Sequence, residues 1–107
     1  LRQLDELGFA LVDVPGSFGE SDLVALAARL GRPERALRGP GVVDRLVPRT
    51  RETGFPNSQS SRYGLSQFPL HTDGAVSETP PRFLLLHAVA GGDLAATTLC
   101  DTRTLFD

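Results

Sequence analysis

The sequence predicts an α+β fold that is mainly β and corresponds to the first part of a jelly roll. Residues 1–30 alternate as helix, strand and helix. Two strongly apolar segments, 82–89 and 95–100, flank the turn residues Gly91-Gly92-Asp93 and predict neighbouring buried strands. An α/β beginning followed by a β-rich end is typical of a β-sandwich or jelly roll that is only partly present. The chain begins with Leu1 rather than Met, so we expect a piece of a longer protein.

The length, charge and cysteine content limit the classes of protein to which this chain can belong. The 107 residues are enough for one partial domain, which we divide into an α/β lead-in (1–47), a flap-like loop (48–67) and the first part of a metal-binding β core (68–107). The net charge of -2 provides no basic surface for nucleic acid or membranes. No apolar run approaches the roughly 18 residues of a membrane span. The single cysteine is typical of a reducing compartment, so we expect a cytoplasmic protein.

The first elements follow from apolar spacing and turn residues. Leucines at positions 1, 4 and 7 predict a helix that Gly8 ends. Residues 9–14 predict a buried strand, which Pro15-Gly16 ends. Ser21 is the expected N-cap of a second helix, whose leucines line one face before Gly31 ends it.

The later elements are separated by a long polar segment. Residues 42–47 predict a short strand. Residues 48–67 have no apolar period, and loops of this length are usually functional lids or disordered, so we interpret this segment as a mobile flap, with a solvated linker as the alternative. After the two apolar strands, Asp101 is expected to cap a helix that begins near Thr102.

The tripeptide His71-Thr72-Asp73 is the strongest chemical signal. On an extended backbone, side chains two residues apart point to the same side, so His71 and Asp73 can bind one metal ion. A second His would complete the 2-His-1-carboxylate triad of non-heme Fe(II) oxygenases. Alone the motif is weak, because Asp73 can equally cap a turn at Gly74. Its context strengthens it: a polar loop precedes it, and Pro80-Pro81 follows it before an apolar segment.

Three segments of the chain carry a recognisable pattern when taken together. They are Pro69-Leu70-His71-Thr72-Asp73-Gly74, Glu78-Thr79-Pro80-Pro81-Arg82-Phe83-Leu84-Leu85-Leu86 and Ala96-Thr97-Thr98-Leu99-Cys100-Asp101. This combination resembles the taurine dioxygenase and clavaminate synthase-like Fe(II)/2-oxoglutarate oxygenases. The resemblance implies a double-stranded β-helix (jelly roll) and a reaction in which O2 oxidises a C–H bond of a small-molecule substrate while 2-oxoglutarate yields succinate and CO2.

The resemblance assigns roles to individual residues. It implies that His71 and Asp73 are the first two Fe(II) ligands, and that Thr98, rather than Thr97, binds the carboxylate of 2-oxoglutarate. The family's distal His and clamping Arg are expected from the rest of the same chain, so these 107 residues should be inactive alone. Ser61 and Gln67 match positions where related enzymes contact substrate or cosubstrate, although both are equally compatible with a solvent-facing loop.

The remaining candidates are assigned structural roles. His87, in an apolar segment, is expected to be a buried, hydrogen-bonded histidine rather than the third ligand. Arg82 is expected at the surface, and Cys100 is expected to be an inert core residue.

Two other functions stay open. One is a cupin-like metalloenzyme that does not use 2-oxoglutarate. The other is a non-catalytic binding module in which His71 and Asp73 are structural.

Overall fold

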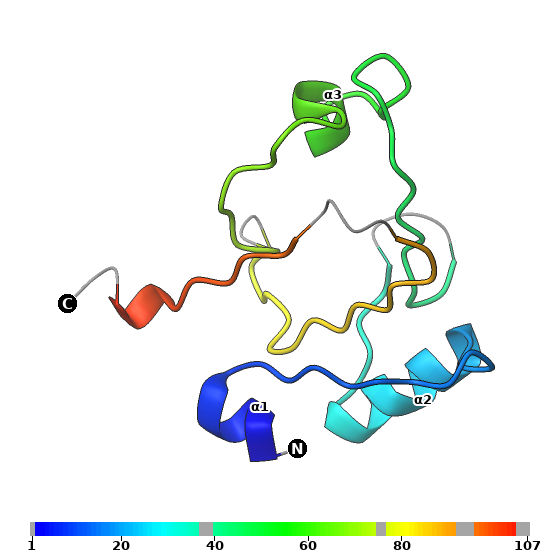
Figure 1. Cartoon of the computed structure of the whole chain (residues 1–107), viewed down its shortest axis with the longest axis vertical. Coiled ribbons are helices and arrows are strands. Elements are labelled where there is room, and N and C mark those ends of the chain that lie inside the picture. Colours follow the sequence, from blue (N-terminus) through cyan, green and yellow to red (C-terminus); the bar gives the residue numbers. More distant parts are fainter. Residues whose placement is uncertain (1, 37–39, 75–76, 92–95, 105–107) are drawn as a thin grey trace.

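The computed structural model describes residues 2–36, 40–74, 77–91 and 96–104, and its regular elements are short helices (Figure 1). They are α1 (Arg2–Leu7), α2 (Glu20–Leu30), α3 (Gln59–Tyr63) and the 3-10 helix η1 (Thr102–Thr104). Across the described ranges, no helix is long and apolar enough to cross a membrane.

Glycines and a carboxylate set the bounds of the first two helices. At the end of α1, Gly8 adopts a φ of 82° and its amide donates a hydrogen bond of 3.0 Å to the Leu4 carbonyl. The N-cap of α2 is Gly19 rather than the expected Ser21. Asp22 determines this start, because its Oδ2 accepts a hydrogen bond of 2.8 Å from the Gly19 amide. Gly31 ends α2 as expected, with its amide 3.1 Å from the Ala27 carbonyl oxygen.

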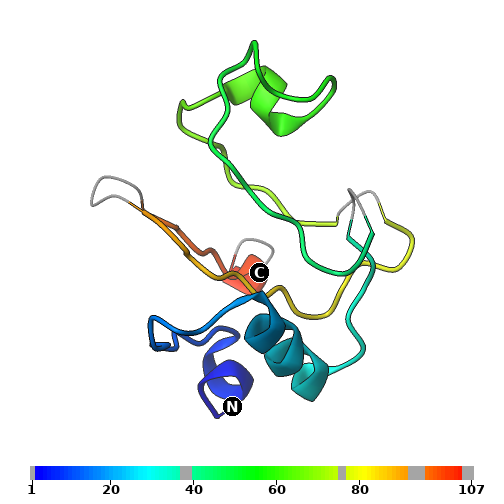
Figure 2. The ribbon, with the colours of Figure 1, turned by 90° about the vertical axis from the view of Figure 1, so that its right-hand side faces the viewer.

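The expectation of a mainly β fold that forms the first part of a jelly roll, or double-stranded β-helix, is wrong for the part of the chain that the structure describes. None of the described residues forms a β-strand, including those in the four segments predicted as strands, which are 9–14, 42–47, 82–89 and 95–100 (Ala95 lies outside the described residues). Figures 1 and 2 show the last two of these segments running in opposite directions, yet no backbone hydrogen bond joins their described residues. A strand requires a partner for its backbone groups, and apolar side chains alone do not provide one.

The described side chains form no buried core. Many apolar side chains are well exposed, among them Leu11 (87%), Leu46 (81%) and Val89 (86%). The chain has an accessible surface of 10054 Å², against about 5,800 Å² for a folded monomer of this mass. Its radius of gyration is 15.2 Å, whereas a compact domain of this length has about 13 Å. The fold is therefore an open one, in which local turns carry most of the order.

Two contacts connect distant parts of this open chain. Arg45 donates from Nη2 and Nε to Glu20 Oε2 at 2.7 and 3.1 Å, which ties the segment after residue 40 to the start of α2. The rings of Phe18 and His87 meet edge to face, with centroids 5.0 Å apart. Both contacts hold segments against the N-terminal end of α2.

Residues 50–64, which lie within the expected flap, form a compact loop that we call the Ω-loop (Figures 1 and 2, green segment at the top). The Gly54 amide donates to the Thr50 carbonyl at 2.9 Å, and Ser58 caps α3 by accepting from the Ser61 amide at 3.3 Å. The ends of the loop meet, because a Cβ on Gly64 would lie 3.0 Å from the Arg51 backbone nitrogen. This segment therefore contains a helical turn that the sequence analysis did not predict.

Substituting Gly54 by Ala is expected to open the Ω-loop. A Cβ at this position would lie 2.8 Å from the Ser61 nitrogen and 2.9 Å from Ser60 atoms, which backbone atoms cannot accommodate without moving. We expect a loss of about 1 to 3 kcal/mol of local stability, measured by hydrogen exchange of the Gly64 amide. Gly16→Ala is the matched control, because a Cβ there meets nothing within 4 Å. Equal exchange rates in both variants would contradict the close packing of Gly54.

Candidate metal centre

The side chains of His71 and Asp73 converge, although the segment forms no strand and Asp73 lies in a turn. His71 Nε2 lies 3.3 Å from Asp73 Oδ1. Metal–nitrogen and metal–oxygen bonds are each about 2.1 Å long, so one ion can bond to both atoms across this gap. An imidazole nitrogen and a carboxylate oxygen are also the ligand types of an Fe(II) facial triad.

The hydrogen bond at His71 Nδ1 determines whether Nε2 carries a hydrogen or a lone pair in the neutral ring. Nδ1 lies 3.1 Å from the Pro69 carbonyl oxygen. A carbonyl only accepts hydrogen bonds, so we assign the hydrogen to Nδ1. In a neutral ring of this tautomer Nε2 carries a lone pair, and it lies 3.3 Å from the carboxylate oxygen of Asp73. A metal ion needs a lone pair of this kind from its histidine ligand, so the tautomer is compatible with a cation at this end of the ring.

A tight turn fixes the backbone immediately after Asp73. Gly74 has a φ of 72°, a conformation that glycine adopts without strain. Its carbonyl accepts a hydrogen bond of 3.0 Å from the Ser77 amide. A Cβ at Gly74 would lie 3.0 Å from Pro81 Cδ, so the Pro80-Pro81 pair packs directly against this turn. The proline pair noted in the sequence therefore supports the backbone that presents Asp73.

The pair is open to solvent and to further ligands. The side chains of His71 and Asp73 are 40% and 56% exposed. Exposed ion pairs contribute little stability, so attraction between the two groups alone does not hold this geometry. No group of three His, Cys, Asp or Glu side chains suited to a metal ion occurs among the described residues. The site thus offers two ligands from one short segment.

A series of aromatic rings contacts His71, and no role was predicted for these rings from the sequence. The Phe68 ring is 4.2 Å from the His71 ring, centroid to centroid, with the planes tilted by 54°. Phe68 in turn meets Tyr63 of α3 edge to face at 5.4 Å. The signal available in the sequence was the spacing of three aromatic rings at positions 63, 68 and 71.

The other predicted site residues are not brought to the pair. Thr98 is exposed, and no hydrogen bond links it to His71 or Asp73 in the described part of the chain. The Ser61 hydroxyl donates to the Ser58 carbonyl at 2.6 Å, so it is engaged within the Ω-loop. Gln67 is exposed in the segment between α3 and the pair.

The two residues expected in the core are also more exposed than predicted. His87 is half-buried against Phe18 rather than fully buried, and it lies apart from the pair. Cys100 is exposed rather than in a core.

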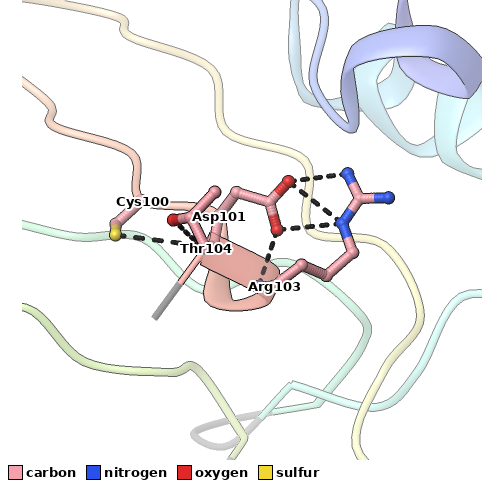
Figure 3. Close-up of polar contacts among 4 residues, drawn as sticks. All are labelled: Cys100, Asp101, Arg103 and Thr104. Carbon is pink, nitrogen blue, oxygen red and sulfur yellow. Dashed lines mark hydrogen bonds and ion pairs between the residues drawn. The ribbon is translucent and has the colours of Figure 1, made fainter. Parts of the chain in front are cut away.

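Another ion pair joins Arg103 to Asp101, the capping residue of η1 (Figure 3). Asp101 Oδ1 accepts a hydrogen bond of 2.9 Å from the Arg103 amide, which confirms the expected cap. The Arg103 guanidinium also donates to both carboxylate oxygens, at 3.0 Å from Nε and 2.6 Å from Nη2. These hydrogen bonds from Arg103 lower the pKa of Asp101 from 3.8 to about 2, and they raise the pKa of Arg103.

Comparisons with known proteins add no assignment. No protein-family model, no curated protein and no solved structure matched this chain. The case for its function therefore rests on its own residues.

Substituting Arg103 by Leu is expected to raise the pKa of Asp101 from about 2 toward 3.8. A carboxyl with a depressed pKa contributes stability that is present above its unfolded value and is lost as the pH falls through its folded value. The cap of η1 should therefore persist at pH 4 and be lost near pH 2. In the variant it should be lost at a higher pH that still lies below 3.8, because the backbone amide of residue 103 continues to donate to Asp101. NMR titration of the Asp101 side-chain carbon measures this. An unchanged midpoint in the variant would contradict the assigned cause.

Proposed function

We propose that this chain is the part of an Fe(II)/2-oxoglutarate-dependent oxygenase that carries the first two metal ligands. The observation that carries the proposal is the convergence of His71 Nε2 and Asp73 Oδ1 at 3.3 Å, with Nδ1 engaged by the Pro69 carbonyl. The family resemblance of residues 69–101 gives the specific metal and cosubstrate. The proposal depends on this motif and its local geometry, and it makes no use of the overall fold.

The residues of the chain have separable tasks in this proposal. His71 and Asp73 hold the metal, and the Pro69 carbonyl keeps Nδ1 protonated so that Nε2 is free to bind. The turn at Gly74 presents the carboxylate of Asp73 beside the ring. Thr98 is proposed to orient a carboxylate of 2-oxoglutarate, on the strength of the resemblance alone.

The bound metal and its cosubstrate would supply the oxidising chemistry, with O2 as the oxidant, 2-oxoglutarate converted to succinate and CO2, and a C–H bond of a small molecule oxidised. A further histidine and a clamping arginine from outside the described residues are proposed to complete the site. With two protein ligands, metal binding should be weak and turnover absent.

Exogenous imidazole offers a direct test, because it can occupy the position of the third ligand. The chain with Fe(II), ascorbate, O2 and 2-oxoglutarate should release no succinate above the protein-free background. Millimolar imidazole, together with guanidinium in place of the clamping arginine, should induce release that His71→Ala and Asp73→Ala each abolish. His87→Ala is the matched control and should leave the induced release unchanged, because His87 packs against Phe18 away from the pair.

Two outcomes of this assay would contradict the proposal. Succinate release without imidazole would mean that two ligands are sufficient or that the chain supplies a third. Failure of imidazole with guanidinium to induce release, while the metal still binds at His71, would favour a metal site that does not use 2-oxoglutarate.

A further inference from the structure

We propose that Phe68, supported by Tyr63, is a positioning residue of the metal site and sets the orientation of the His71 ring. This inference rests on the proposed function, because it concerns the same pair of ligands. It goes beyond it by connecting the metal site to the Ω-loop, of which Tyr63 is part. The pair His71–Asp73 would then be pre-oriented by a stack of aromatic rings rather than by a buried core.

Few other contacts orient the His71 ring. The ring is 40% exposed and no described side chain is buried around it. One hydrogen bond, from Nδ1 to the Pro69 carbonyl, fixes a single point of the ring and allows the plane to swing about it. The Phe68 ring lies 4.2 Å from the His71 ring and blocks that swing from one side. Two contacts on different parts of one ring determine its orientation.

Phe68 is itself held in place from the Ω-loop. Tyr63 is the last residue of α3 and meets Phe68 edge to face at 5.4 Å, a geometry that aromatic pairs favour. The Ω-loop closes on itself through the close approach of Gly64 to Arg51. In Figure 1 the yellow-green segment leads away from α3, and residues 64–74 that follow this helix include Phe68 and His71. The Ω-loop thereby holds Phe68 in place, and Phe68 limits the orientation of the His71 ring.

Metal binding should depend on this stack because a ligand that is already oriented loses less freedom when it binds. Aromatic pairs of this kind are worth enough to change an equilibrium constant about threefold to tenfold. Phe68→Leu keeps an apolar side chain but removes the ring, so we expect weaker metal binding by this factor. Phe68→Tyr keeps the ring and should bind within about twofold of the unaltered chain.

The test uses Mn²⁺ alone as the probe and NMR signals of the two histidine rings as the readout. Mn²⁺ should broaden His71 at lower concentration than His87, and His71→Ala should remove this preferential site. Phe68→Leu should require about three to ten times more Mn²⁺ for the same broadening. Tyr63→Leu should require a Mn²⁺ concentration between those of the unaltered chain and of Phe68→Leu. Phe68→Tyr should bind Mn²⁺ about as tightly as the unaltered chain. The matched control is Phe83→Leu, because Phe83 stacks under Arg82, with the guanidinium carbon 5.2 Å from its ring centroid, away from His71.

A metal-free measurement separates the inference from the proposed function. Without metal, Phe68→Leu should shift the His71 ring signals, because the neighbouring ring current is removed, and should leave the His87 signals in place. Unchanged Mn²⁺ affinity in Phe68→Leu would overturn the inference and leave the metal site standing. Absence of preferential broadening at His71 in the unaltered chain would overturn the metal site and the inference with it. Loss of binding in both Phe68→Leu and Phe68→Tyr would show that the ring is not what matters, which also overturns it.

Discussion

The hydrogen bond between His71 Nδ1 and the Pro69 carbonyl is the interaction on which the candidate site depends. With the hydrogen on Nδ1, the Nε2 atom of a neutral ring carries a lone pair, and it lies 3.3 Å from Asp73 Oδ1. A cation, either a proton or a metal ion, can bind to Nε2 on this side of the ring. A hydrogen bond from the other ring nitrogen to a backbone carbonyl is typical of metal-binding histidines.

All groups that shape the site come from residues 63–81, which explains how it can form in an open chain. The aromatic stack orients one ligand, and the turn at Gly74, packed on Pro81, presents the other. None of these contacts requires a hydrophobic core, and the described residues provide none. The side chains of His71 and Asp73 are thus brought together by local contacts alone.

Some local features could be predicted from the sequence, whereas features that need distant partners could not. The end of α2 at Gly31 and the cap at Asp101 follow from neighbouring residues, and the structure confirms both. The prediction of strands was wrong. Apolar segments such as 82–89 indicate a preference for burial, but they do not indicate which segment of the chain would pair with them. The convergence of His71 and Asp73 was predicted for an extended backbone, although the segment forms no strand and Asp73 lies in a turn. The carbonyl behind the ring and the role of Phe68 were not predictable, because both depend on how the chain turns between residues 63 and 71.

Nitrogen-15 NMR of the His71 ring in the presence of Zn²⁺ identifies which ring nitrogen binds the metal. We predict that Nε2 becomes the metal ligand while Nδ1 keeps its hydrogen, bonded to the Pro69 carbonyl. We also predict that Asp73→Asn weakens this binding and that the His87 ring is unaffected. Metal bound at Nδ1, or equal changes at both histidines, would contradict the proposed metal site.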